Sequence, residues 1–116
     1  MIHDDKNENS DRKQRLEREL MRVVDVIVRH YHPRKILLFG SLATGDVHEW
    51  SDVDIVIVMD TKARLIDRIG EVLSLCRPRV AMDFLVYTPE EFDRLARDEQ
   101  FVQEEIVERG RVLYAA

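Results

Sequence analysis

The sequence predicts an α/β fold in which helices pack on a small β-sheet. A long stretch with apolar residues at three- and four-residue steps opens the chain. Short apolar runs with the length of strands follow, and helical stretches separate them. This order is typical of an α/β sandwich. We expect a single domain over residues 1–116, because this length allows one buried core and leaves no room for a second.

The first element is a helix that begins at Ser10 or Asp11, since both are good N-caps. It ends at His32 and Pro33, because the residue before a proline is pushed out of helical geometry. The apolar side of this helix is formed by Leu16, Leu20, Val23, Val24, Ile27, Val28 and Tyr31. The polar residues 1–9 that precede it are expected to be disordered.

Two strands come next, with a glycine turn between them. Residues 36–39 are a continuous apolar run, which is the pattern of a strand covered on both faces. Gly40 and Ser41 then turn the chain, with room for a short helical turn before a polar loop at residues 46–51. Residues 52–59 form the second strand, and its sequence is apolar after the first few positions.

A helix and a third strand follow. Asp60 and Thr61 are expected to cap this helix. Its apolar positions, taken to face inward, are Leu65, Ile69, Val72, Leu73 and Cys76. Residues 79–87 form the third strand, and the strand order does not follow from these patterns.

The last part of the chain carries a complete helix start: Thr88 as cap, Pro89 at the first position and Glu91 at the third. A first helical stretch is expected to turn Phe92, Leu95 and Ala96 inward, and a second helical stretch carries Phe101, Val102, Ile106 and Val107. Gly110 ends the second stretch, and residues 112–114 add a short terminal strand. The exposed apolar edge of that strand would suit a dimer or a hetero-complex.

Charge and composition exclude some classes of function. Charged residues make up 35% of the chain and the net charge is −5, which argues against a general nucleic-acid-binding surface. The basic residues of the first helix alternate with Glu17 and Glu19, so we interpret them as a solvated helix face; they are Arg12, Lys13, Arg15, Arg18 and Arg22. No apolar run could span a membrane and no signal peptide opens the chain. With one cysteine, Cys76, expected to be buried, the sequence indicates the cytoplasm.

The Gly40-Ser41 pair is a candidate phosphate site. A glycine directly after a buried strand lets the backbone approach a ligand closely. If a helical turn begins at Ser41, its first amides and its hydroxyl favour a phosphate group. An ordinary strand-to-helix turn with Ser41 as N-cap is the alternative.

Asp52 and Asp54 are candidate metal ligands. Side chains alternate along a strand, so residues two apart point to one face. Two like charges at the mouth of a buried strand disfavour each other's ionised form unless a cation is present. Mg²⁺ prefers such hard oxygen ligands together with substrate phosphates and water. The alternative makes Asp52 a loop or capping residue and Asp54 a solvent-facing strand residue.

Asp83 is the third candidate carboxylate. It lies within an apolar strand, where an unpaired charge would cost several kcal/mol, roughly, without compensation. A metal shared with Asp54 on an adjacent strand would supply that compensation. A salt bridge to Arg77 or Arg79 is the competing explanation.

Taken together, these residues resemble the DNA-polymerase-β-type nucleotidyltransferase superfamily. The resemblance rests on Gly40-Ser41, Gly45, the run Ser51-Asp52-Val53-Asp54 and the later strand aspartate Asp83. Within that superfamily the chain is most similar to the minimal nucleotidyltransferases, and the similarity extends from about residue 16 to the end. One departure is Thr44, where many family members carry arginine.

This resemblance implies a mixed-sheet fold and a two-metal mechanism. Gly40 and Ser41 would hold the triphosphate of ATP. Asp52, Asp54 and Asp83 would bind two Mg²⁺ ions, and Asp83 would also help to activate the acceptor hydroxyl. Family members of this size act as antitoxins that adenylylate a tyrosine of a small all-helical HEPN ribonuclease toxin, which implies an AMP transfer and a HEPN-type partner here.

The sequence leaves a second function open. An antitoxin or interaction module could bind and mask its partner without catalysis, and Thr44 together with the short chain favours that alternative. Trp50, in the loop before the aspartates, would either stack on a base or simply pack the loop.

Overall fold

A computed structural model describes residues 5–48 and 51–116 and shows four strands in one mixed sheet. The strands are β1 (Lys35–Phe39), β2 (Val53–Val58), β3 (Met82–Tyr87) and β4 (Arg111–Ala115); the helices are α1 (Asp5–Tyr31), α2 (Ser41–Thr44), α3 (Leu65–Cys76), α4 (Pro89–Asp98) and the π-helix η1 (Val102–Glu108). The strand order is β3-β2-β1-β4, with β2 and β3 parallel and the other neighbours antiparallel. The predicted α/β class, with a small mixed sheet packed with helices, is confirmed.

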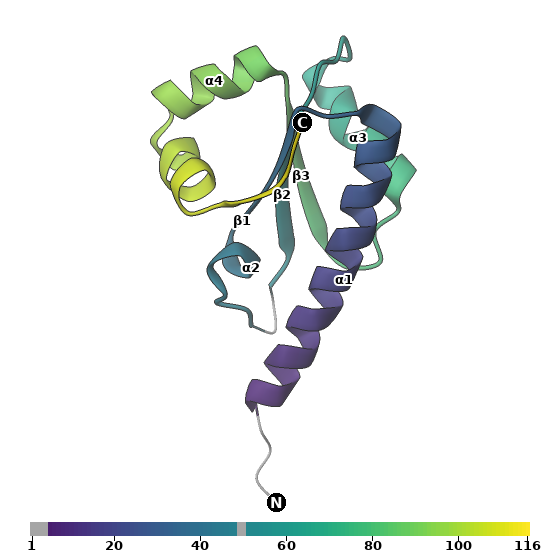
Figure 1. The fold of residues 1–116 in the computed structure, drawn as a ribbon, viewed down its shortest axis with the longest axis vertical. Helices are drawn as coiled ribbons and strands as arrows, with labels where there is room; N and C mark the ends of the chain where they lie inside the picture. Colours follow the sequence, from purple (N-terminus) through teal and green to yellow (C-terminus); the bar gives the residue numbers. More distant parts are fainter. Residues whose placement is uncertain (1–4, 49–50) are drawn as a thin grey trace, which may run out of the picture.

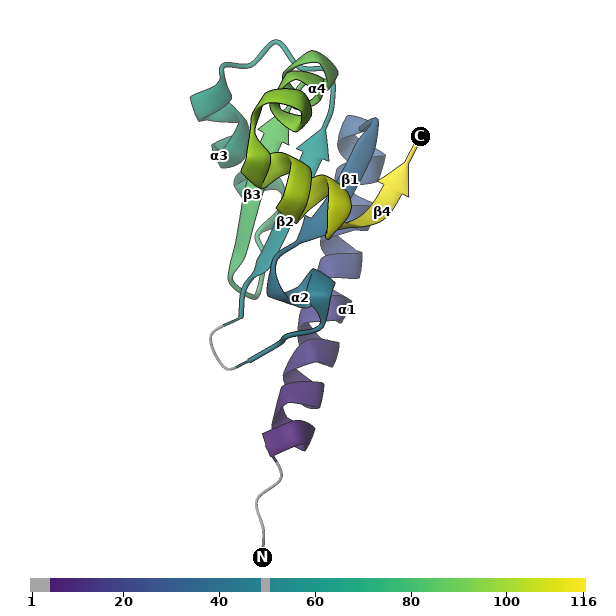
Figure 2. The ribbon, with the colours of Figure 1, turned by 90° about the vertical axis from the view of Figure 1, so that its left-hand side faces the viewer.

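Helices cover both faces of this sheet (Figures 1 and 2). On one face α1 and α3 pack against alternate strand residues such as Ile55 and Ile57. On the other face α4 and η1 pack against the intervening residues, such as Val56 and Val58. Because strand side chains alternate between faces, the central strands are apolar throughout, as the continuous runs predicted.

Helix α1 ends where the sequence predicted, at Tyr31, but it begins earlier. The expected apolar side is buried at Leu16, Leu20, Val23 and Ile27. The start at Asp5 shows that the predicted N-cap at Ser10 or Asp11 was wrong. Of residues 1–9, which were expected to be disordered, residues 1–4 lie outside the described residues. An apolar stripe reveals only the turns that pack against a core. The first turns of α1 extend past the end of the sheet (Figure 1), where no such stripe is needed.

Helix α3 differs most from the prediction. It begins at Leu65, with Arg64 as N-cap, and not directly after Asp60 and Thr61. Three residues predicted to face inward are exposed: Leu65 (55%), Ile69 (37%) and Leu73 (40%). Buried instead are Arg68, Val72 and Cys76, which recur at four-residue steps and so share one face. The buried face of α3 is therefore rotated relative to the predicted one. Arg68 can lie on this face because its guanidinium donates hydrogen bonds to Ala63, Val86 and Glu91.

The elements after β3 follow the prediction closely. Thr88 forms a complete capping box with Glu91 at the start of α4. Helix η1 ends at Glu108, just before Gly110, where a Cβ would collide with the Ile106 carbonyl oxygen. Val102 and Ile106 of η1 are buried, whereas Val107 (47%) and Phe101 (56%), which directly precedes η1, are exposed. The terminal strand β4 exists and lies at one edge of the sheet.

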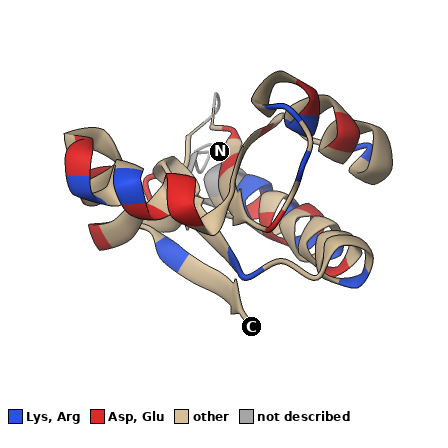
Figure 3. Cartoon of the chain, turned by 90° about the horizontal axis from the view of Figure 1, so that it is seen from above, with Lys and Arg blue, Asp and Glu red and all other residues tan. Residues whose placement is uncertain are grey.

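Acidic and basic residues occur together on the helices of both sides (Figure 3). No helix in the described part of the chain is long and apolar enough to cross a membrane.

Candidate active site

Two of the predicted carboxylates meet across β2 and β3. In the parallel register Asp54 lies directly opposite Asp83. Both side chains belong to the sheet face that α4 and η1 cover further along the strands, since Val56 and Leu85, two residues later, pack there. At the start of the strands the face lies beside α2 (Figure 2). The sequence predicted that Asp83 would join Asp54 on an adjacent strand, and the register brings them together.

Asp54 is in an environment that disfavours its charge. Its pKa is raised from an ordinary 3.8 to about 6. Burial is the largest cause, followed by the negative charges of Asp83 and Asp52 and by a hydrogen bond with the Asp83 side chain. The negative charges of Asp83 and Asp52 therefore act on the Asp54 carboxylate.

Asp83 is exposed, not buried among apolar neighbours as the sequence suggested. The reason is that β3 is an edge strand and Asp83 is only its second residue, at the uncovered end. The competing salt bridges are not formed: among the described residues no ion pair joins Asp83 to Arg77 or Arg79. The Arg79 backbone N–H donates to Glu19 instead. Asp52, just before β2, is also exposed.

Gly40 is required by its position against Asp54. Its φ of +78° lies in the left-handed region, which side chains other than glycine rarely adopt. A Cβ added to Gly40 would also collide with the Asp54 carboxylate oxygen Oδ2. The turn after β1 therefore lies in contact with the carboxylates.

The predicted helical turn after Gly40 is α2. The amides of Ala43 and Thr44 both donate to the Gly40 carbonyl, at 3.1 and 3.2 Å. Thr44 Oγ1 donates to the Ser41 carbonyl at 3.3 Å, and Gly45 ends the helix in the left-handed region. The Thr44 side chain therefore bonds within its own helical turn. Many members of the family that the sequence resembles are expected to carry arginine at this position.

Comparison with known proteins shows which family the chain belongs to. Residues 20–114 match the model of the nucleotidyltransferase domain family, which is most of the chain. The chain belongs to this family. A nucleotidyltransferase is a transferase enzyme, and the resemblance noted in the sequence is confirmed.

Two relatives extend this assignment. The "Putative protein adenylyltransferase" of Methanocaldococcus jannaschii is 33% identical over 84% of this chain and 97% of the relative. The crystal structure of a "putative nucleotidyltransferase" from Sulfolobus solfataricus has a TM-score of 0.62 and 25% identity, covering 74% of this chain and 78% of its own. Both span most of this nucleotidyltransferase, so the fold and the reaction class apply to the domain as a whole.

The residues of the site fit a divalent cation that arrives with its nucleotide. Within residues 5–48 and 51–116, no group of three acidic, histidine or cysteine side chains is already arranged to hold a metal ion. Mg²⁺ usually takes one or two carboxylates and completes its shell with substrate phosphates and water. Asp54 would supply partly buried oxygen ligands, and a bound cation would offset the burial and like charges that disfavour its ionised form.

An aromatic pair beside Asp54 was not anticipated. Phe39 is the cross-strand neighbour of Asp54 on β1. It meets Phe101 edge-on, with ring centroids 6.2 Å apart, and Phe101 is 56% exposed. Trp50, considered for base stacking, lies outside the described residues.

Proposed function

We propose that this nucleotidyltransferase moves AMP from ATP to a hydroxyl group, in a reaction that depends on Mg²⁺. The observation that carries the proposal is the contact between the Gly40 turn and Asp54, whose carboxylate also faces Asp83. This contact brings the candidate phosphate-binding turn and the carboxylates of the site to one place.

The roles follow from this placement. Gly40 and Ser41 hold the triphosphate, and Asp52 and Asp54 are the ligands for two Mg²⁺ ions, with Asp83 completing the site. The acceptor oxygen attacks the α-phosphorus, the bond from that phosphorus to the departing pyrophosphate breaks, and Asp83 assists removal of the hydroxyl proton. Bound Mg²⁺ would make the attacking hydroxyl more acidic and neutralise charge on the pyrophosphate.

The acceptor we propose is a tyrosine hydroxyl of a partner protein. The name of the archaeal relative, a protein adenylyltransferase, supports a protein acceptor. The sequence resemblance adds a small all-helical HEPN-type toxin as partner, with this chain acting as its antitoxin in the cytoplasm. The edge strand β4, with Val112 exposed (55%), offers a surface through which a dimer or hetero-complex could form.

The test uses ATP labelled at its α-phosphate, Mg²⁺, and the purified product of the neighbouring gene. Wild type should label the partner. The Asp52→Ala, Asp54→Ala double variant should lose at least about a thousandfold in rate. Asp93→Ala, which removes an exposed carboxylate from α4, is the matched control and should keep full activity. Equal labelling by wild type and the double variant would refute the assigned roles.

The same variants separate catalysis from simple masking. If the double variant still folds and binds the partner but no longer neutralises it in cells, transfer is the function. If it neutralises the partner as well as wild type does, the non-catalytic interaction module is the correct account.

A further inference from the structure

A hydrogen-bonded link connects helix α1 to the candidate phosphate-binding turn through Ser51. Ser51 is only 2% exposed, which is unusual for a polar residue in a loop. Its hydroxyl oxygen accepts from the His48 backbone N–H at 2.8 Å and from the Ser41 hydroxyl at 3.1 Å. Its carbonyl accepts from the Arg12 guanidinium at 2.8 Å.

We infer that Ser51 is a positioning residue for phosphate binding, which acts by orienting the Ser41 hydroxyl, and that Arg12 holds Ser51 in place. This inference rests on the proposed function, in which Ser41 contacts the triphosphate. It assigns a role in the site to α1, a helix that the resemblance does not connect with nucleotide binding.

The chemistry of the two hydroxyls supports this role. A serine hydroxyl has one proton to donate and two lone pairs that accept, and it rotates to suit its surroundings. In the structure, the Ser41 hydroxyl donates its proton to a hydrogen bond with the Ser51 hydroxyl oxygen. Rotation of both O–H bonds reverses the direction, so that Ser51 donates to Ser41 and the Ser41 proton becomes available to a phosphate oxygen. No heavy atom has to move for this reversal.

The His48 N–H makes the reversed arrangement a directed chain. A backbone N–H can only donate, so it continues to occupy one lone pair of Ser51 in either direction. The donors then run from His48 to Ser51 to Ser41 and on to the phosphate. Hydrogen bonds in such a chain polarise and strengthen one another.

Arg12 anchors the chain from outside the loop. Its bond to the Ser51 carbonyl joins residues 39 apart in sequence, and so ties α1 to the segment just before Asp52. Arg12 Nε is buried without a hydrogen-bond partner in the described part of the chain. Burying an unpaired N–H is unfavourable, and the bond from the Arg12 guanidinium to the Ser51 carbonyl offsets part of this cost. The interpretation of Arg12 as part of a solvated face was therefore wrong.

The decisive experiment is a double-mutant cycle on Ser41 and Ser51. Binding of a non-hydrolysable ATP analogue with Mg²⁺ is measured by calorimetry for wild type, Ser41→Ala, Ser51→Ala and the double variant. We expect each single variant to weaken binding about three- to tenfold, the range of one hydrogen bond. Because Ser51 acts through Ser41, the double variant should bind no more weakly than Ser41→Ala alone. A purely structural role would multiply the two losses.

Three further variants keep the test valid if Ser51→Ala does not fold. Arg12→Gln should weaken binding of the analogue and raise KM for ATP more than it lowers kcat. Arg15→Gln, which removes an exposed arginine from the next turn of α1, should change neither. Ser51→Thr, which keeps the hydroxyl, should restore most of the affinity.

The outcomes distinguish this inference from the proposed function. If wild type binds the analogue but Ser51→Ala binds equally well, or its loss multiplies with that of Ser41→Ala, only the positioning role fails. If Arg12→Gln behaves as Arg15→Gln does, Arg12 is not the anchor. If wild type does not bind the analogue at all, both the proposed function and this inference are overturned.

Discussion

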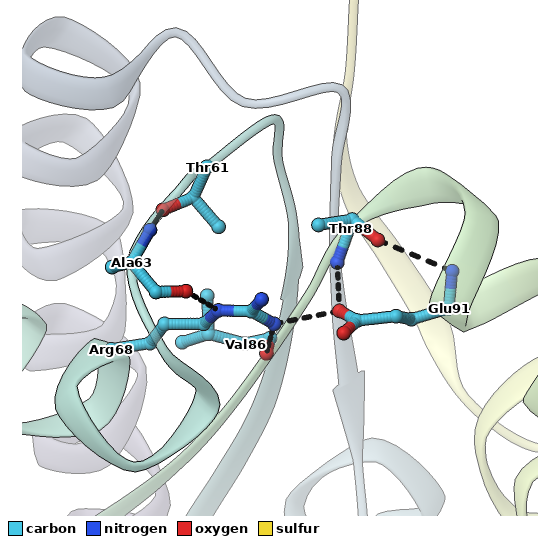
Figure 4. Close-up of polar contacts among 6 residues, drawn as sticks. All are labelled: Thr61, Ala63, Arg68, Val86, Thr88 and Glu91. Atoms are coloured by element: carbon cyan, nitrogen blue, oxygen red, sulfur yellow. Dashed lines mark hydrogen bonds and ion pairs between the residues drawn. The ribbon is translucent and has the colours of Figure 1, made fainter.

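The two ends of strand β3 differ in whether the charged side chains beside them are paired. Near the last residues of β3, the Arg68 guanidinium donates to a Glu91 carboxylate oxygen at 2.6 Å and to the Val86 carbonyl at 3.2 Å (Figure 4). Arg68 Nε donates to the Ala63 carbonyl, and the same Glu91 oxygen accepts from the Thr88 N–H. At the first residues of β3, Asp83 faces Asp54 and the nearby charges acting on Asp54 are negative.

The difference separates charges that hold the fold together from charges held ready for a ligand. Hydrogen bonding to Arg68 lowers the pKa of Glu91, so this carboxylate remains ionised and joins α3 to the start of α4. Burial and like charge raise the pKa of Asp54, so the folded chain gains nothing from its negative form. The paired Glu91 therefore belongs to a structural contact, whereas Asp54, beside two like charges, belongs to the candidate site.

Removing a paired charge should have the largest effect on stability. Arg68→Ala should lower the free energy of unfolding by about 3 kcal/mol, because it leaves Glu91 and the Val86 carbonyl without their shared donor. Arg64→Ala, which breaks an exposed pair with Asp67, should cost less than about 0.5 kcal/mol. Urea unfolding followed by circular dichroism measures both. Equal effects would show that burial of the pair does not matter.

A second paired charge, that of Glu19, should make the free energy of unfolding depend on pH. Glu19 accepts from Arg22 at 2.7 Å and from the Arg79 N–H, and these bonds lower its pKa from 4.5 to about 2. The ionised form is favoured by folding, so its contribution is complete above pH 4.5 and is lost as the pH falls toward 2. Since Arg22 is 33% exposed, we expect about 2 kcal/mol, not the full shift.

Urea unfolding of wild type and Glu19→Gln across that range tests this expectation. The variant should be about 2 kcal/mol less stable at pH 7 and equal to wild type near pH 2. A difference that persists unchanged at pH 2 would attribute the effect to packing and not to charge.

Removing an unpaired charge should have the smallest effect and the opposite sign. In metal-free buffer at pH 7.5, Asp54→Asn should raise the free energy of unfolding by about 1 kcal/mol, because an amide relieves the repulsion from Asp52 and Asp83. Added Mg²⁺ should stabilise wild type and affect the variant less. Asp60→Asn, at an exposed pair with Arg34, should change little. A destabilised Asp54→Asn would contradict the contrast between the two ends of β3.

Much of the site was predictable from the sequence, and the reasons are local. The spacing of Asp52 and Asp54 predicts that both point to one side of the chain at the start of β2, although β2 begins one residue after Asp52, and the glycine after β1 predicts a close turn. The exact pairing of Asp54 with Asp83 was not predictable, because strand order does not follow from periodicity.

The buried Arg68 illustrates the other limit of sequence reasoning. Arginine is rarely buried, so the apolar pattern of α3 placed Leu65, Ile69 and Leu73 inward instead. The groups that satisfy Arg68 lie 18 and 23 residues further along the chain, at Val86 and Glu91. No local pattern reports such a distant partner. The contact between Arg12 and Ser51 was not predictable for the same reason, because these residues lie 39 positions apart in the sequence.

The parallel pairing of β2 with β3 limits how this domain can change in length. Shifting β3 by a single residue would turn Asp83 to the opposite face and expose the apolar residues that now pack beneath α3. A deletion or insertion within residues 77–81 would force such a slip unless the segment absorbed it. Natural variants of this domain should therefore keep that connection at constant length, while the segment between β2 and α3, at the other end of the sheet, remains free to vary.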